Sequence, residues 1–398
     1  MNYILFDPPE IEKFYPFTLT RPLAEMRVFG GTIKELWEQF LGCKVSHLTS
    51  PYLSELYPTK WTDENILIPS THLPKIENGV DLNSQLVNNS LTIIKDSCDL
   101  EIAQHTFFSK YDISKDSQHN SVFLIKNNNG ECASLHDCFG SLYEKVDGDK
   151  LPRSLISKLM STVHRLDMIP YKLSQLKSKF PNVFFNDDNG PIIIEEDVVI
   201  MEGAMIKGPV HICSGSTIKM GAKIYGPTLI GPQCKIGGEV SNCLFLGYSN
   251  KAHDGFLGHS IIGEWCNIGA GTNNSNLKND YGFVKMWDYY ECKFKASANN
   301  RVKSQFLGLY MGDHSKCAIN RSFNTGTTVG VNCNIFGFGF PRNFIPSFSW
   351  GGPQGIKEYD LNKAIFVAKK VMQRRGVELE DTYYDMLSNV HNITSKYR

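Results

Sequence analysis

The chain has 398 residues, more than one hydrophobic core usually serves, so two or three structural units are expected. Apolar residues make up 41% and charged residues 21%, as in ordinary globular proteins, and 41 basic residues balance 41 acidic ones, so no net charge attracts nucleic acid or anionic lipid. No stretch approaches the ~18 apolar residues of a membrane span, the N-terminus lacks the features of a secretory signal, and the eleven cysteines contain no C-x-x-C pair. We therefore expect a cytoplasmic protein with reduced thiols, with neither a nucleic-acid partner nor a membrane span.

Residues 1–185 combine short apolar runs with segments of helical spacing. NYILF, NILIP and SVFLI have the length of buried strands, whereas TIKELWEQF and SLISKLMSTVHRL read as helices. This alternation predicts an α/β domain.

An isoleucine recurs at every sixth position from residue 194 to residue 236, and a small or β-branched residue follows each of the first seven by four positions. A helix cannot present a period of six on one face. A prism with sides of about six residues can, because one isoleucine per side points inward and a small residue fits each corner. Stacking such coils of roughly eighteen residues gives a parallel β-helix. The isoleucines are Ile194, Ile200, Ile206, Ile212, Ile218, Ile224, Ile230 and Ile236.

The period resumes, shifted in phase, at Ile262 and Ile268, and again from Met311 to Ile335. Residues around 237–261 and 272–306 are therefore predicted to leave the prism as loops. The first gap leads into KAHDGFLGHSIIGEWCNIGAGTNNSN, from Lys251 to Asn276, which is rich in glycine, histidine and asparagine. Long loops on a rigid scaffold are either disordered or functional.

The C-terminal part begins with FGFGFPRNFIPSFSWGG, whose aromatic residues and prolines suit the closed end of a prism. Asp360 is expected to cap a helix that ends at Gly376, and a last helix is expected over roughly 379–395, packed on the β-helix or on a neighbouring subunit. The predicted divisions are an α/β domain at 1–185, a β-helix at 186–350 and a helical tail at 351–398.

The stretch A-H-D-G-F-L-G-H-S-I-I-G-E-W-C-N-I-G-A-G-T-N-N-S-N resembles a motif of hexapeptide-repeat acyltransferases. In the bifunctional enzymes that make UDP-N-acetylglucosamine it has the form A-G-H-x-x-x-L-G-D-x-x-I-G-x-x-x-N-I-G-A-G-T-x-x-x-N. The whole chain is similar to the alternative form of that family found in the Bacteroidetes group. The resemblance implies a left-handed β-helix that transfers an acetyl group from acetyl-CoA to an amino-sugar phosphate, in a homotrimer with acyl-CoA bound between neighbouring subunits.

Acetylation of an amine requires a base, because an ammonium group has no lone pair with which to attack the thioester. Histidine is the usual candidate, and His253 lies where the family places its base. The resemblance further implies that Asn267 and Asn276 contact the substrate, that the main chain of Ala270 touches the thioester of acetyl-CoA, and that Lys251 serves the sugar phosphate. Backbone N–H groups of the glycine-rich loop could stabilise the oxyanion.

Structural roles remain open at these positions: His253 could cap the loop, and Asn267 could be a stacked ladder residue. His259 stands where the family motif has aspartate, and a structural role is favoured for it. Phe256 replaces an aromatic hydroxyl of the family, which removes one hydrogen bond to the sugar.

Three histidines can hold zinc in β-helices of the γ-carbonic-anhydrase type, and His253 and His259 with His211 or His314 would be the set here. That reading does not explain N-I-G-A-G-T, so no metal ligand is assigned in the β-helix.

Family enzymes carry a nucleotidyltransferase domain at the N-terminus, opening with a G-x-G-T-R loop that holds the nucleotide phosphates. This chain has F-D-P-P-E instead, whereas PFTLTRPLAEMRVFGGTIKELWE is similar to the later half of the signature. Arg21 is the candidate phosphate contact, and Arg27 and Lys34 are weaker candidates for the same role. Asp7 is the candidate ligand if the domain uses Mg²⁺.

The leading hypothesis is a sugar-nucleotide enzyme that joins acetyl-CoA-dependent N-acetylation of an amino-sugar phosphate to nucleotidyl transfer from UTP or dTTP to a sugar 1-phosphate. One alternative keeps the acyltransferase and makes the N-terminal domain a degenerate binding module, as the missing glycine loop favours. Another is a non-catalytic scaffold or regulatory subunit, which would need none of the motif residues.

Overall fold

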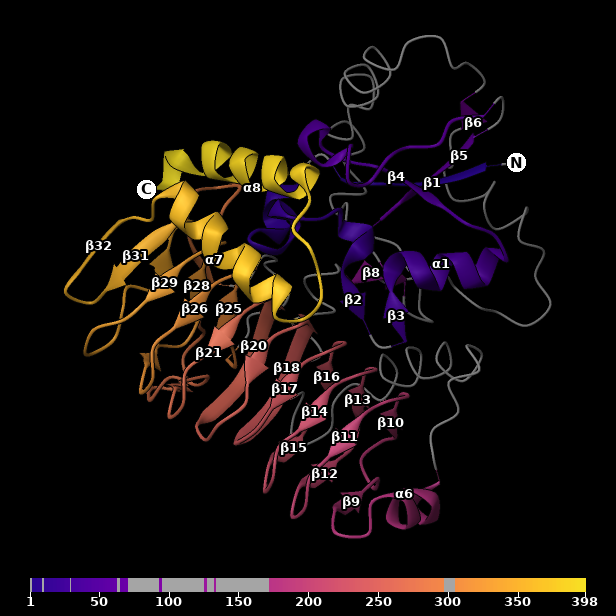
Figure 1. Ribbon diagram of the computed structural model, residues 1–398, viewed down its shortest axis with the longest axis vertical. Coiled ribbons are helices and arrows are strands. Elements are labelled where there is room, and N and C mark those ends of the chain that lie inside the picture. Colours follow the sequence, from indigo (N-terminus) through magenta and orange to yellow (C-terminus); the bar gives the residue numbers. More distant parts are fainter. Residues whose placement is uncertain are drawn as a thin grey trace. The chain divides into compact units, whose positions relative to one another are not determined.

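The computed structural model describes residues 2–8, 11–28, 30–62, 65–70, 172–296 and 305–398, together with short strands at 93–94, 125–126 and 132–133 (Figure 1). Two compact units share the chain. The first comprises Met1–Ile11 and Arg21–Cys138, and the second comprises Glu12–Thr20 and Phe139–Arg398. The predicted helix SLISKLMSTVHRL and most of SVFLI lie outside the described residues.

The first unit contains a mostly parallel sheet with the strand order β4-β1-β5-β6, in which only β6 runs antiparallel to its neighbour. Helix α1 begins in a capping box, because Thr32 Oγ1 accepts the Glu35 N–H and the Glu35 carboxylate accepts the Thr32 N–H. It ends at Gly42, whose φ of 70° suits glycine. The predicted α/β character is confirmed in the described part. The elements are β1 (Asn2–Phe6), η3 (Leu23–Glu25), β2 (Arg27–Val28), β3 (Gly31–Thr32), α1 (Ile33–Leu41), β4 (Ser46–Leu48), η4 (Pro51–Leu53), β5 (Asn65–Pro69), β6 (Ile93–Ile94), β7 (Ile125–Lys126) and β8 (Cys132–Ala133).

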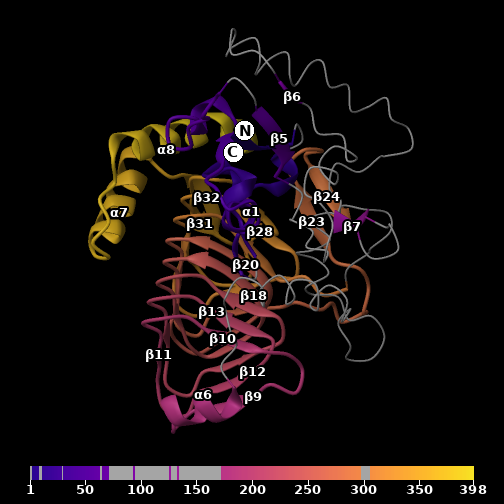
Figure 2. The same ribbon diagram turned by 90° about the vertical axis from the view of Figure 1, so that its right-hand side faces the viewer.

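The second unit is a parallel β-helix, as the six-residue period predicts. Figure 2 shows its coils stacked from α6 and β9 at one end to β31 and β32 at the other. The first side contains β10 (Ile192–Ile194), β13 (Val210–Ile212), β16 (Thr228–Ile230), β18 (Glu239–Gly247), β20 (Phe256–Glu264), β25 (Leu309–Met311), β28 (Thr327–Val329) and β30 (Phe344–Ile345). The second side contains β11 (Val199–Ile200), β14 (Thr217–Ile218), β17 (Lys235–Ile236), β19 (Asn250–Lys251), β21 (Asn267–Ile268), β26 (Lys316–Cys317), β29 (Asn334–Ile335), β31 (Ser349–Gly352) and the antiparallel β32 (Gly355–Glu358).

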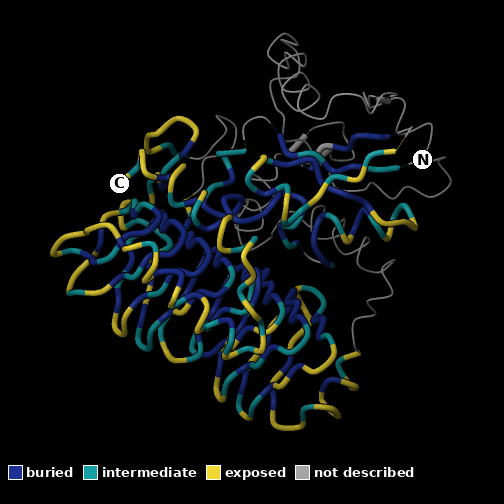
Figure 3. The backbone as a smooth tube through the Cα atoms, turned by 45° about the horizontal axis from the view of Figure 1, so that its top comes forward, coloured by how far each residue is buried: buried dark blue, intermediate teal, exposed yellow. Residues whose placement is uncertain are grey.

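The third side begins with β9 (Phe184–Asn186), β12 (Met205–Lys207) and β15 (Lys223–Tyr225), continues through the first halves of β18 and β20, and ends in β22 (Asn273–Asn274) and β27 (Ser322–Phe323). All eight isoleucines of the period are buried in one continuous core. Figure 3 shows this buried interior, with exposed residues at the corners of the coils.

The prediction that residues 237–261 leave the prism is wrong. Strand pairing places Val240, Phe245 and Lys251 beside the inward Ile224, Ile230 and Ile236 of the preceding coil.

The coil is only shortened there, because the inward residues Ile236, Val240 and Phe245 are separated by steps of four and five residues instead of six. Asn242 and His259, with φ of 54° and 49°, each turn a corner within a nine-residue strand, so fewer residues are needed. A search for a fixed period of six residues therefore does not detect these shortened coils.

The second predicted loop does leave the prism, after Asn274 rather than at 272. It carries an antiparallel hairpin of β23 (Lys285–Asp288) and β24 (Lys293–Ala296). Trp287 of the hairpin stacks on Phe344, with ring centroids 4.2 Å apart, and Tyr289 packs edge-on against Phe344 and Tyr397. The loop is therefore fastened to the last coils and to the C-terminus.

The C-terminal helices and the N-terminal segment of the unit pack on the coils of the β-helix. Asp360 caps α7 as predicted, accepting the Lys363 N–H at 2.9 Å, and Gly376 follows its last turn with φ of 72°. Both C-terminal helices pack on the β-helix, where Arg375 donates to Asn250 Oδ1 at 2.8 Å and Tyr383 bonds His314 at 2.8 Å. No helix of the described residues is long and apolar enough to cross a membrane. The elements are η1 (Ile11–Phe14), η2 (Phe17–Leu19), α6 (Leu173–Lys179), α7 (Leu361–Gln373), α8 (Asp381–Ile393) and η6 (Ser395–Tyr397).

Candidate active site

His253 lies at the corner between the second and third sides of the β-helix, and its side chain is exposed. Three residues separate the inward Lys251 from Gly255, which turns the corner with φ of 120°. Only two residues separate Ile268 from the corner glycine Gly271 in the next coil. The extra residue makes this corner longer than its neighbour, so the sequence change marks an enlarged corner and not a long loop.

Lys251 occupies an inward position of the second side, where the coils on either side have isoleucine. Its side chain is fully buried, and its ammonium group donates to the carbonyl oxygens of Gly237, at 3.2 Å, and of His253. Burial lowers the pKa of Lys251 to about 8, against a smaller opposing effect of Asp254. The ammonium group therefore anchors the His253 corner from inside, and the structure does not support its predicted direct contact with a sugar phosphate.

Ala270 lies in the corner of the next coil, directly beside the His253 corner. The Gly271 N–H donates to the Asp254 carbonyl at 2.9 Å, and the Ala270 carbonyl accepts the Asn320 N–H at 2.7 Å. The two corners are thus stacked, which brings Ala270 next to the segment that carries His253. The Gly271 N–H is already used in this stack, so it is not the oxyanion donor in this structure.

The same edge exposes large apolar side chains in other coils. Met220, Ile319 and Phe336 occupy the corresponding corner and are 69%, 63% and 38% exposed. Met220 lies two coils before the His253 corner, and Ile319 and Phe336 lie two and three coils after it, so exposed apolar side chains flank this corner along one edge.

Asn267 is exposed on the second side and stacks on Asn250, whose Nδ2 donates to Asn267 Oδ1 at 3.4 Å. Asn250 in turn accepts a hydrogen bond from Arg375 at the end of α7. The ladder arrangement considered for Asn267 is therefore present, and its exposed side chain still leaves it reachable from solvent.

The three asparagines of TNNSN, at the point where the chain leaves the prism, hold the start of β20 in the preceding coil. The Phe256 N–H donates to Asn273 Oδ1 at 2.8 Å. Asn274 accepts the Gly258 N–H at 2.8 Å and donates to the Gly258 carbonyl at 3.0 Å. Asn276 Nδ2 lies 2.8 Å from His259 Nδ1. His259 is 7% exposed and stacks on Phe306 with centroids 5.0 Å apart, which agrees with its expected structural role. The Asn276 amide is engaged in this support, so the structure does not present it as a free substrate contact.

Arg21 is buried in the first unit, 5% exposed. The segment before it, Glu12–Thr20, belongs to the second unit, and Thr20 Oγ1 donates to Asp313 Oδ2 at 2.8 Å. The predicted phosphate motif is thus divided between the units. The other two basic candidates form ion pairs, Arg27 with Glu35 at 3.7 Å and Lys34 with Glu25 at 3.5 Å.

Asp7 follows β1 at the carboxyl edge of the parallel sheet, the edge where ligands bind in α/β folds. Its Oδ1 accepts the Leu23 N–H at 2.8 Å and its Oδ2 accepts the Thr49 hydroxyl at 2.6 Å. Burial raises the pKa of Asp7 to about 6, although these hydrogen bonds and His47 oppose the rise. A carboxyl group with both oxygens used and a raised pKa does not fit the role of a Mg²⁺ ligand.

Asp7→Asn should stabilise the protein at pH 7 by up to roughly 3 kcal/mol, the equivalent of about two pKa units. An Asp whose folded pKa exceeds its unfolded pKa destabilises the fold once it ionises. The penalty is absent below about pH 4 and complete above about pH 6. Asparagine keeps an acceptor for Leu23 and can donate to Thr49. Urea unfolding of both proteins between pH 4 and pH 7, with the exposed Asp280→Asn as control, measures the difference, and a gap that does not widen with pH would contradict the assignment.

Residues 3–128 match a family model described as sugar nucleotidyl transferase. The chain is 34% identical over 149 residues to the bifunctional sugar-1-phosphate nucleotidylyltransferase/acetyltransferase of Sulfurisphaera tokodaii, covering 37% of this chain and 35% of that protein. It is 30% identical over 187 residues to the bifunctional protein GlmU of Methanococcus aeolicus, covering 45% and 40%. The chain thus spans less than half of the length of either relative.

Among solved structures, the chain is similar to the polySia specific acetyltransferase NeuO, with 14% identity, coverage of 44% of this chain and 81% of that one, and a TM-score of 0.25. It is also similar to the Arabidopsis UDP-N-acetylglucosamine acyltransferase, with 12% identity, coverage of 55% and 79%, and a TM-score of 0.24. Scores this low carry no argument about function.

Proposed function

We propose that this chain, which is similar to bifunctional GlmU proteins and matches the sugar nucleotidyl transferase family at residues 3–128, is a sugar-nucleotide enzyme of that kind. Its β-helix would transfer an acetyl group from acetyl-CoA to the amine of an amino-sugar phosphate. Its N-terminal unit would transfer a nucleotidyl group to a sugar 1-phosphate.

The observation that carries the acetyltransferase proposal is the enlarged corner that exposes His253. The corner is held from inside by Lys251 and stacked on the turn of Ala270. A histidine that only capped a turn would not need a buried ammonium group beneath it, because burying a charge is costly. An exposed base on a rigid corner, with Ala270 and an apolar edge beside it, suits a reaction between two bound substrates.

In the proposed reaction His253 takes a proton from the ammonium of the amino sugar, and the free amine attacks the thioester carbonyl. The nitrogen of the tetrahedral intermediate loses a second proton to solvent, and the intermediate collapses with cleavage of the carbon–sulfur bond, which gives the amide and the thiolate of coenzyme A. The proton taken by His253 can then pass to that thiolate, so the histidine returns to its starting state. Exposed Asn267 remains a candidate for contact with the sugar, and Ala270 for contact with the thioester.

The nucleotidyl transfer proposal rests on the family match and on the parallel sheet of the first unit. Its substrate would be a nucleoside triphosphate such as UTP or dTTP, with Arg21 retained as the proposed phosphate contact. The absence of a G-x-G-T-R loop after β1 favours a second candidate, in which this unit binds a nucleotide without turning it over. No step is assigned to Mg²⁺, because Asp7 does not fit it.

The test is a turnover screen of the full chain with acetyl-CoA and a panel of amino-sugar phosphates, following thiol release, and then with nucleoside triphosphates and the acetylated products, following pyrophosphate release. Thiol release followed by pyrophosphate release would support both activities. Thiol release alone would support the candidate with a non-catalytic N-terminal unit. If neither product is formed with any member of the panel, the scaffold alternative is favoured.

A homotrimer is the expected assembly, with the exposed apolar edge of one subunit facing its neighbour. Burying side chains such as Met220 and Ile319 between subunits would remove apolar surface from water. Light scattering at micromolar protein concentration should give three times the mass of the 44.9 kDa chain. A monomeric mass for the parent, or an unchanged trimer when both residues are replaced by aspartate, would contradict this arrangement.

A further inference from the structure

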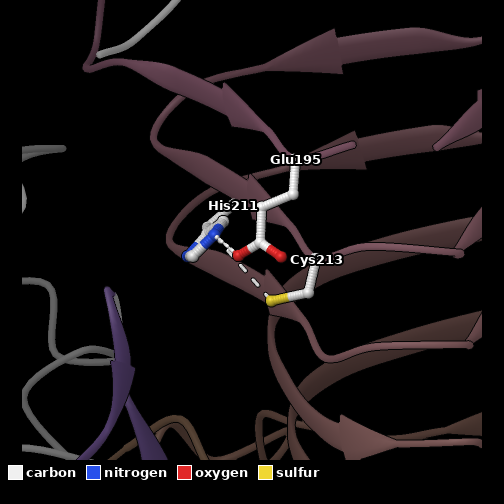
Figure 4. A group of neighbouring side chains, drawn as sticks. All are labelled: Glu195, His211 and Cys213. Atoms are coloured by element: carbon white, nitrogen blue, oxygen red, sulfur yellow. Dashed lines mark hydrogen bonds and ion pairs between the residues drawn. The ribbon is translucent and has the colours of Figure 1, made fainter. Parts of the chain in front are cut away.

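A second group of reactive side chains lies near the start of the β-helix, several coils before the His253 corner. Glu195 and Cys213 directly follow Ile194 and Ile212, which pair in register between β10 and β13. They are therefore stacked at the same corner of successive coils. His211 and Cys213 are two residues apart, which places them on the same face of the strand. Figure 4 shows the three side chains converging.

The ligand atoms of the three side chains all lie within 4.8 Å of one another. The His211 Nε2 atom is 2.7 Å from Glu195 Oε1 and 3.8 Å from Cys213 Sγ. His211 and Cys213 are essentially inaccessible to solvent, whereas Glu195 is partly exposed. The Ser214 N–H donates to the other oxygen of Glu195 at 2.9 Å, which orients the carboxylate with Oε1 toward the histidine.

We propose that Glu195, His211 and Cys213 form a binding site for Zn²⁺ or a similar borderline-soft divalent cation. Thiolate, imidazole and carboxylate are the three ligand types that zinc takes in proteins. Zinc–ligand bonds of about 2.0–2.3 Å separate neighbouring ligand atoms by about 3.3–3.8 Å in a tetrahedron. The Nε2–Sγ distance already meets this, and the Glu195–His211 pair needs to open by less than about 1 Å.

Binding would replace the Glu195–His211 hydrogen bond with two metal bonds. The proton that Nε2 donates to the carboxylate would leave Nε2, so that the neutral imidazole carries its proton on Nδ1, and the Cys213 thiol proton would pass to solvent. The Ser214 N–H would continue to orient the carboxylate, as outer partners of metal ligands do. Three protein ligands leave a fourth position for a water molecule or another small ligand, on the side of the partly exposed Glu195. The site joins two successive coils, and it is separate in the sequence from the residues proposed for acetyl transfer.

The experiment is titration of the metal-free full chain with Co²⁺, a spectroscopic probe for zinc sites, followed by displacement with Zn²⁺. We expect one equivalent of Co²⁺ to bind with a tetrahedral visible spectrum and a thiolate charge-transfer band, both lost on addition of Zn²⁺. Cys213→Ser should abolish the charge-transfer band, and Glu195→Gln should weaken binding by more than the roughly 10–100-fold caused by loss of an outer partner. Cys43→Ser is the matched control, because Cys43 is an exposed cysteine of the first unit.

Circular dichroism of each variant checks that the fold is retained. The proposal is overturned if the parent binds no Co²⁺ above the background of Cys213→Ser, or if Cys43→Ser rather than Cys213→Ser loses the band. Because Glu195→Gln changes only one ligand oxygen and preserves the shape of the side chain, it keeps the test decisive should Cys213→Ser fail to fold.

Discussion

Replacing His253 with alanine should lower the rate of acetyl transfer by about 10²–10⁴-fold, the usual loss when a general base is removed. The side chain is exposed, and its main chain is held by the Lys251 ammonium group, so the substitution removes the base without opening the core. The measurement is steady-state thiol release from acetyl-CoA with the amino-sugar phosphate that the parent protein acetylates.

The rate of the parent should also fall as the pH is lowered, because a protonated imidazole has no lone pair with which to accept the amine proton. His391→Gln is the matched control, since His391 lies on α8 and bonds Glu358 at 2.8 Å, in a different part of the unit. An alanine variant with undiminished turnover would remove His253 from the mechanism.

Lys251→Met should slow acetyl transfer by about 10-fold to 10²-fold and at the same time stabilise the protein. The loss of rate follows because the ammonium group no longer holds the His253 carbonyl, and a displacement of about 1 Å in a catalytic group can reduce the rate 10²-fold. The gain in stability follows because a charged group in an inward position is replaced by an apolar side chain of similar length.

The stability effect has a defined pH dependence. Burial lowers the pKa of Lys251 in the folded protein to about 8 from 10.5, so the unfolded chain holds the proton more tightly. The charged lysine therefore destabilises the fold below about pH 8, and this penalty disappears as the pH rises toward 10.5. The methionine variant should be more stable by about 1–3 kcal/mol at pH 7. The gain can be as small as the lower value because two carbonyl oxygens partly replace the water that the lysine ammonium group loses on burial.

Urea unfolding of the two proteins at pH 7 and pH 10 measures this difference. Ile236→Met, at the inward position of the preceding coil, is the control, because an apolar exchange of similar volume should change stability by less than about 1.5 kcal/mol at both pH values. A methionine variant that is less stable than the parent at pH 7, or equally active, would show that Lys251 does not anchor the corner as described.

Much of the second unit followed from the sequence alone. The eight isoleucines at a spacing of six determined the β-helix, because the inward positions of successive coils stack in one continuous core that apolar side chains fill. The capping residues of the C-terminal helix could also be predicted, because Asp360 and Gly376 cap it through residues close to them in the chain. His253 was found from an ordered motif, whose match to a family does not depend on the fold being known.

The coils between Ile236 and Ile262 were decided by the tertiary structure. Val240 and Phe245 fill the core at shorter steps, which become visible only when their strands pair with the coil before. The same pairing turns Lys251 inward, against the expectation that a lysine beside a catalytic histidine faces its substrate.

Contacts between coils likewise cannot be inferred from the order of residues along the chain. Asn274 supports Gly258 and Asn276 supports His259 across sixteen or seventeen residues, so Asn276, which was expected to contact a substrate, holds the scaffold in this structure. Glu195 and Cys213 meet because they are one coil apart. The number of residues in each coil decides which residues become neighbours. That number is set when the corners close and the strands form hydrogen bonds, and the local sequence alone does not specify this register.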